Sequence, residues 1–138
     1  MKKIFLIFVY FIFTSAFFAQ EWVAIAKEDN GNITYVNDKN FSNIGNPKIW
    51  TKKIGNIKVY SMNRMNEEIK GYQLTFSEYN CENYSFKIIK TLYYKDNDKL
   101  FDSMTFSKEL DHWNTVIPET ANYIVLDNVC RKFDRNYR

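Results

Sequence analysis

The feature that most constrains the fold is the C-terminal segment 117–133, taken together with a cysteine far upstream at position 81. Pro118 suits the start of a helix, and Thr120 is the expected N-cap, with Glu119 beside the positive helix end. A helix this short is marginal in isolation, so we expect its apolar side to pack on another element. The residues that share that side by helical spacing are Tyr123, Leu126, Cys130, Phe133 and Tyr137.

The first 19 residues have the organisation of a secretory signal peptide. Lys2 and Lys3 form a positive start, residues 4–13 are an unbroken apolar run, and small residues follow at Ser15, Ala16 and Ala19. The alternative is a membrane anchor, but the mainly apolar stretch, about fifteen residues when counted on to Phe18, is short for a span that needs roughly 20. We therefore expect residues 1–19 to be removed on export, although cleavage after Ala16 also fits. The exported domain, residues 20–138, would have no membrane-spanning segment, and its destination is left open between periplasm, outer surface and medium.

The chain has two cysteines, Cys81 and Cys130. An even number of cysteines in an exported chain predicts one disulfide. This bond would close a loop of about fifty residues and stabilise the fold by on the order of 4 kcal/mol. The alternative is a pair of free thiols.

Alternating and β-branched segments between the signal and the helix predict strands. The Asp-Asn-Gly-Asn sequence at 29–32 accepts positive φ and predicts a hairpin turn. Another turn is expected at Gly55-Asn56, and 62–70 is a loop or a single helical turn. The predicted class is α+β, a roughly six-stranded antiparallel meander with the C-terminal helix packed on one face and tied by the disulfide. The strands are expected at 21–27, 33–36, 48–54, 72–77, 84–94 and 100–106.

One register conflicts with this arrangement. Tyr72, Leu74 and Phe76 share the apolar side of their strand, and an apolar sheet face is expected to receive the helix. Cys81 instead has the parity of Thr75 and Ser77, so the disulfide would begin on the other side. A bulge, or the bend of the hairpin near Cys81, would be needed to turn the Cys81 side chain to the apolar side.

The charge balance argues against nucleic acid as a partner. Without Lys2 and Lys3 the 19 basic residues fall to 17, against 16 acidic residues. The charges are dispersed except at a basic C-terminal tip. This tip is either a solvated helix end, where cations are favoured by the helix dipole, or a contact site for an acidic partner surface. Its residues are Arg131, Lys132, Arg135 and Arg138.

The sequence contains no complete catalytic or metal-binding set. His112 is the single histidine, and Asp111 beside it proves nothing, because a catalytic aspartate orients its histidine from across the fold. A zinc site needs three or four ligands, and a phosphate-binding loop needs clustered glycines. We therefore predict no enzymatic activity, no cofactor and no metal. Trp22, Trp50 and Trp113 are expected in the core.

A series of short motifs runs along the whole mature chain. They are E-W-V-A-I from Glu21, N-I-T-Y-V-N from Asn32, K-I-W-T around Trp50, L-T-F-S-E-Y-N-C ending at Cys81, T-L-Y-Y-K-D-N-D-K from Thr91, W-N-T-V-I-P-E-T from Trp113, and N-V-C ending at Cys130. This order resembles the bacterial surface-adhesin E family. Glu119 departs from the family pattern, which usually has glycine between the proline and the following serine or threonine.

The resemblance implies a six-stranded antiparallel sheet with a C-terminal helix tied to it by a disulfide, with Cys81 and Cys130 in the matching positions. The founding member of that family is an adhesin that binds host matrix and serum proteins. We therefore expect an exported, non-enzymatic binding protein that takes protein partners and mediates adhesion to extracellular proteins. The alternative is a periplasmic or envelope housekeeping module that binds another bacterial protein or a small apolar ligand. A homodimer is also open, and no binding residue carries over from the family.

Three surface features would separate these functions. An adhesin should expose an aromatic or basic patch. A ligand-binding module should have an apolar pocket between helix and sheet. An enzyme should gather titratable groups in a cleft.

The signal peptide leads to a first prediction. Protein recovered from the cell envelope or the medium should begin near Glu21, because the signal is removed during export. Intact-mass measurement tests this directly. A mass that retains residues 1–16 would contradict export by this route.

Overall fold

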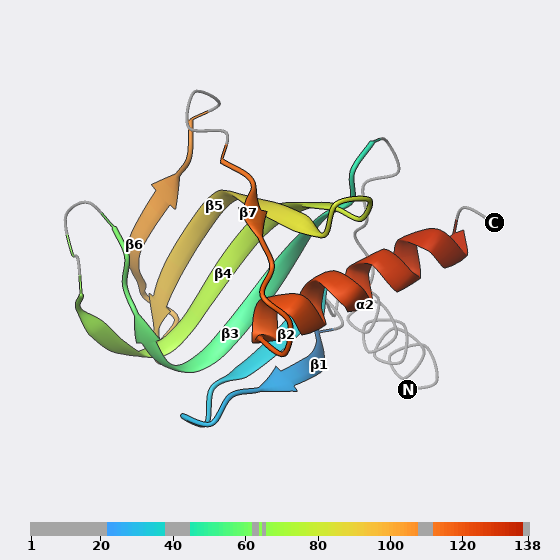
Figure 1. Ribbon diagram of the computed structural model, residues 1–138. Helices are drawn as coiled ribbons and strands as arrows, with labels where there is room; N and C mark the ends of the chain where they lie inside the picture. The colour runs from blue at the N-terminus through green and yellow to red at the C-terminus, as the bar shows by residue number, and fades with distance from the viewer. Residues whose placement is uncertain (1–21, 38–44, 62–63, 65, 108–111, 137–138) are drawn as a thin grey trace, which may run out of the picture.

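The computed structural model of the protein describes residues 22–37, 45–61, 64, 66–107 and 112–136. These residues form one antiparallel sheet and one helix, α2 (Ala121–Asn136) (Figure 1). The first six strands are ordered in the sheet as they are in the chain, each hydrogen-bonded to its sequence neighbours, which confirms the predicted meander. A short seventh strand pairs with the fifth. The strands are β1 (Trp22–Lys27), β2 (Ile33–Asn37), β3 (Lys48–Lys58), β4 (Glu68–Asn80), β5 (Ser85–Lys95), β6 (Leu100–Thr105) and β7 (Asn114–Thr115).

The predicted turn at Gly55-Asn56 is wrong, because β3 continues through it and pairs with β4 along its whole length. Gly55 lies opposite Gly71 in this pairing. A Cβ atom would lie 2.1 Å from the Asn32 side-chain oxygen at Gly55, and 2.0 Å from the Tyr94 carbonyl oxygen at Gly71. Both glycines therefore permit close approach of neighbouring chain within the sheet. The stretch 62–70, expected to be a loop or one helical turn, is strand from Glu68, where β4 begins. Residues 62–63 and 65 lie outside the described part.

The helix covers the side of the sheet that the alternation pattern did not select. Paired residues of β3 and β4 follow one another without a shift, so the parity of β4 is never reset. Tyr79 therefore lies on the same side as Thr75 and Ser77, and it packs in one core with α2. The expectation that the Tyr72, Leu74 and Phe76 side receives the helix is wrong. That core contains Val36, Ile49, Tyr79, Val116, Val125, Leu126, Val129 and Cys130.

The disulfide follows from this parity. Cys81 comes directly after β4 and lies on the helix side, so it meets Cys130 without any reset. The two cysteines are bonded across 49 residues of sequence, with their Cα atoms 5.6 Å apart. The predicted Cys81–Cys130 bond is confirmed, and it ties the end of β4 to the last turns of α2.

The start of α2 is capped as the sequence predicts. The Thr120 hydroxyl accepts a hydrogen bond from the Tyr123 backbone N–H at 3.3 Å and donates one to the Ile117 carbonyl at 2.7 Å. Glu119, just before the cap, has a φ of 66°. This left-handed conformation favours glycine, which explains why a glycine is usual at this place in the resembled family.

A second, smaller core holds the other end of the sheet. Ile57, Val59, Ile69 and Tyr93 are buried together, with Phe101 packed against them. The backbone N–H of Tyr60 donates to the Tyr93 hydroxyl at 3.3 Å, and burial raises the pKa of this phenol. By register these side chains share the helix side, so both cores lie on one side of the sheet.

The disulfide gives a stability prediction. In Cys130→Ala the free energy of unfolding should fall by about 2–5 kcal/mol, because the long loop is no longer closed in the unfolded chain. The Cys81→Ala/Cys130→Ala double variant should fall by a similar amount and serves as the control for the free thiol. Urea unfolding of the mature domain measures both. A loss below about 0.5 kcal/mol would show that the bond does not secure the helix.

The strained residue before the helix cap, Glu119, gives a further stability prediction. Glu119→Gly should raise the free energy of unfolding by roughly 0.5–1 kcal/mol, since glycine relieves the strain of positive φ and gives back part of that gain as chain entropy. Glu82→Gly is the matched control, because Glu82 is also an exposed glutamate in a turn but is not among the residues with positive φ. Destabilisation by Glu119→Gly would contradict the account of the cap.

Candidate functional site

The side of the sheet opposite α2 has no helix or second sheet over it among the described residues, and we call it the open face (Figure 1). Directly paired residues in an antiparallel sheet project to the same side, so the register defines the members. The central rows join Tyr35, Lys52, Leu74 and Leu92, then Trp50, Phe76 and Lys90, and finally Ile54, Tyr72 and Tyr94. Five of these ten side chains are aromatic, which is unusual for an uncovered sheet face.

The aromatic rings of the open face are held in stacked pairs. Trp50 and Phe76 have ring centroids 5.1 Å apart, and Tyr72 and Tyr94 have centroids 4.9 Å apart. The Lys52 ammonium lies 4.2 Å from the centre of the Tyr72 ring. These contacts across strands hold large side chains in fixed positions before any partner arrives.

Tyr72 is fixed at both ends. Its hydroxyl donates to a carboxylate oxygen of Asp98 at 2.9 Å. Burial, together with this hydrogen bond, raises the pKa of the Tyr72 phenol to about 12. The ring therefore stays neutral at physiological pH and acts as an apolar surface with one polar edge.

The open face is accessible although its side chains shield one another. Ile54 is 38% exposed, and the stacked rings are half-buried by their neighbours on the pleated surface. The expectation that Trp50 belongs to the core is wrong, because no described element packs over it. A contiguous apolar and aromatic surface of this kind is typical of a site for macromolecular contact.

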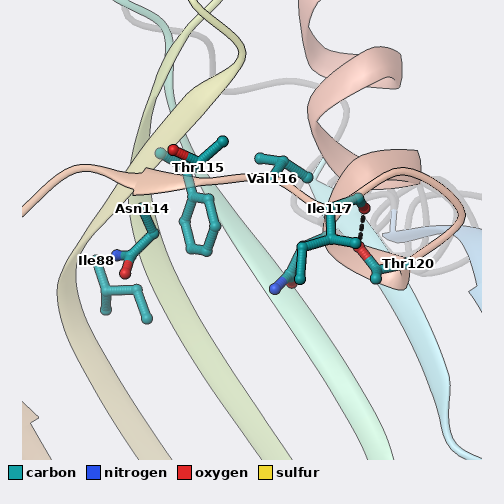
Figure 2. Close-up of a pocket in the computed structure, with 8 residues that line it drawn as sticks. Ile88, Asn114, Thr115, Val116, Ile117 and Thr120 are labelled. Carbon is teal, nitrogen blue, oxygen red and sulfur yellow. Dashed lines mark hydrogen bonds between the residues drawn. The ribbon is translucent and has the colours of Figure 1, made fainter.

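A pocket lies on the other side of the sheet, beside the start of α2. Its volume is about 320 Å³, and Figure 2 shows it between β5, β7 and the chain that leads into the helix. One part of its wall is apolar and the other part carries amide and hydroxyl groups. The apolar residues are Phe86, Ile88, Val116 and Ile117, and the polar ones are Asn114, Thr115, Thr120 and Asn122.

The basic tip is less available than its sequence implies. Arg131 makes two contacts to Asp127, from Nη2 at 2.9 Å and from Nε at 3.1 Å. Lys132 is half-buried, and the side chain of Arg135 and all of Arg138 lie outside the described part of the structure. A partner-contact role for Arg131, Lys132 and Arg135 stays a prediction.

The described residues do not assemble a catalytic centre. His112 is exposed, and Asp111 lies outside the described part. The pKa of Asp102 is held low, chiefly because its carboxylate accepts a hydrogen bond from the Ser61 hydroxyl. This pair joins β6 to the chain after β3 and is structural. Among the residues that the structure describes, no three potential ligands gather as a metal site requires.

These features define a disulfide-tied domain whose sheet is covered on one side by a helix and presents aromatic rings on the other. Residues 22–131 match the family described as Surface-adhesin protein E, and the chain belongs to this family. No curated protein and no solved structure matches it. Membership in this family indicates a binding protein, and the disulfide indicates a protein that is exported. In the described part of the chain, no helix has the length and apolar character to cross a bilayer.

Proposed function

We propose that the protein is exported and non-catalytic, and that it binds protein partners through the open face. The observation that carries this proposal is the set of stacked aromatic pairs on a sheet face without a covering element. We further propose that these partners are extracellular proteins, so that binding mediates adhesion. Membership in the surface-adhesin E family supports this.

The stacked rings of the open face have the properties of the side chains that dominate binding at protein interfaces. Binding energy at protein interfaces is concentrated in a few aromatic and arginine side chains near the centre of the contact. Trp50, Phe76, Tyr72 and Tyr94 occupy such a central position, and their stacking reduces the side-chain entropy lost on binding. The face is broad and built from several strands, which suits another protein better than a small molecule.

The pocket beside α2 favours a second candidate function, the binding of a small and partly apolar ligand. Its apolar wall, including Phe86 and Ile88, is the kind of surface such a ligand needs. The two functions use opposite sides of the sheet, so one experiment can separate them.

The test is capture of proteins from a matrix-protein panel and from envelope extract by the mature domain. Trp50→Ala should weaken capture by about tenfold, because it removes a central anchor. Tyr84→Ala is the control: Tyr84 is 44% exposed and stacks on Tyr123 of α2, away from the open face. Circular dichroism and thermal unfolding confirm that each variant is folded.

Three outcomes would count against the proposal. Equal capture by Trp50→Ala and wild type would remove the open face as the binding surface. A hydrolytic activity that His112→Ala abolishes would contradict the non-catalytic assignment. A small molecule that co-purifies with wild type and is lost in Ile88→Asp, without protein capture, would favour the pocket instead.

A further inference from the structure

We propose that the partner of the open face is an acidic polypeptide segment that combines carboxylates with apolar side chains. This inference rests on the proposed function and specifies the chemistry of the partner. It follows from the charged residues that lie on the open face.

Lysines gather on the open face although the mature chain is nearly balanced in charge. Lys52 and Lys90 belong to its central rows, and Lys48 and Lys87 lie one row away, on either side of Glu78. Lys27, Lys58 and Lys70 have the same parity nearer the strand ends. Among paired strand residues of this face, Glu68 and Glu78 are the acidic ones.

Two carboxylates lie near the centre, and both are already engaged. Asp98 accepts a hydrogen bond from the Tyr72 hydroxyl at 2.9 Å, and Glu78 lies between two lysines. Glu78 lies 3.7 Å from the Lys48 ammonium and 3.4 Å from the Lys87 ammonium, and it also accepts a hydrogen bond from the Asn46 amide at 3.1 Å. Lys52 and Lys90 have no carboxylate within ion-pair distance among the described residues. The centre of the open face therefore carries uncompensated positive charge.

Each of these two lysines adjoins an aromatic pair. Lys52 lies over the Tyr72 ring, and Lys90 is directly opposite Phe76, which stacks on Trp50. An ion pair formed beside apolar surface that a partner covers is stronger than one in open water, because the effective dielectric constant is lower. The surface thus offers alternating sites for carboxylates and for apolar side chains.

The alternation of lysines and apolar side chains on the open face favours some kinds of partner over others. A second copy of the chain would set lysines against lysines across the contact, which disfavours a homodimer through this face. A sulfated glycan would satisfy the lysines but would bring no apolar side chain to Leu74 and Leu92. An acidic polypeptide with apolar residues satisfies both parts of the surface.

Three polymers serve as probes for the mature domain: a random copolymer of glutamate and tyrosine, polyglutamate, and heparin. Wild type should bind the copolymer most tightly, and added salt should weaken binding. Lys52→Gln/Lys90→Gln should reduce affinity for the copolymer by roughly tenfold, as expected for two partly covered ion pairs. Lys95→Gln/Lys99→Gln is the charge-matched control, since these exposed lysines lie at the β5–β6 turn, and it should change affinity by less than about twofold.

The outcomes separate this inference from the proposed function. If Trp50→Ala weakens protein capture but Lys52→Gln/Lys90→Gln changes neither capture nor copolymer binding, the acidic-partner inference fails and the open face remains the docking surface. If neither variant affects capture, both fail. Tighter binding of heparin that is insensitive to Trp50→Ala would identify a glycan surface, and self-association of wild type abolished by Trp50→Ala would identify a second copy. Either result overturns the inference.

Discussion

The Cys81–Cys130 bond decides which side of the sheet is covered, and the remaining architecture depends on that choice. Cys81 continues the parity of Thr75, Ser77 and Tyr79, so a helix joined to it through Cys130 must lie on their side. A single helix can cover one side of a sheet, and the residues that the structure describes provide no second layer. The opposite side is the open face, which we propose as the docking surface.

Large aromatic rings lie on both sides of the sheet. Tyr79 and Tyr93 are buried on the covered side, whereas other rings lie on the open face. The covered side contains small polar side chains such as Ser77 and Thr91, both 2% exposed, together with the two apolar cores. The uncovered side contains further large rings, among them Trp50 and Phe76. A sequence selected only for stability would place the large rings under the helix, since burial of aromatic surface is strongly favourable. The rings on the uncovered side are the ones that the proposed protein partner would bury.

Local signals allowed much of the fold to be predicted. The cap at Thr120, the apolar spacing through Leu126 and Cys130, and the hairpin turn at 29–32 each depend on a few neighbouring residues. Gly55 was misread because a glycine that permits close approach within a sheet looks the same in sequence as a glycine in a turn. The covered side was misassigned because alternation identifies an apolar side but does not show what lies against it. The parity of Cys81 indicates the covered side correctly, because the disulfide partner Cys130 lies on the helix. The open face could not be predicted, because bringing Tyr35, Lys52 and Lys90 together requires the register of four strands.

The most direct test of a free aromatic face is hydroxyl-radical footprinting of the dilute mature domain. Trp50, Leu74 and Leu92 should oxidise readily, whereas Ile49 and Val129, both fully buried, should be protected. Addition of a bound partner should then protect the first group and leave the second unchanged. Protection of Trp50, Leu74 and Leu92 to the level of Ile49 in the free monomer would contradict the account, because that face would then already be covered.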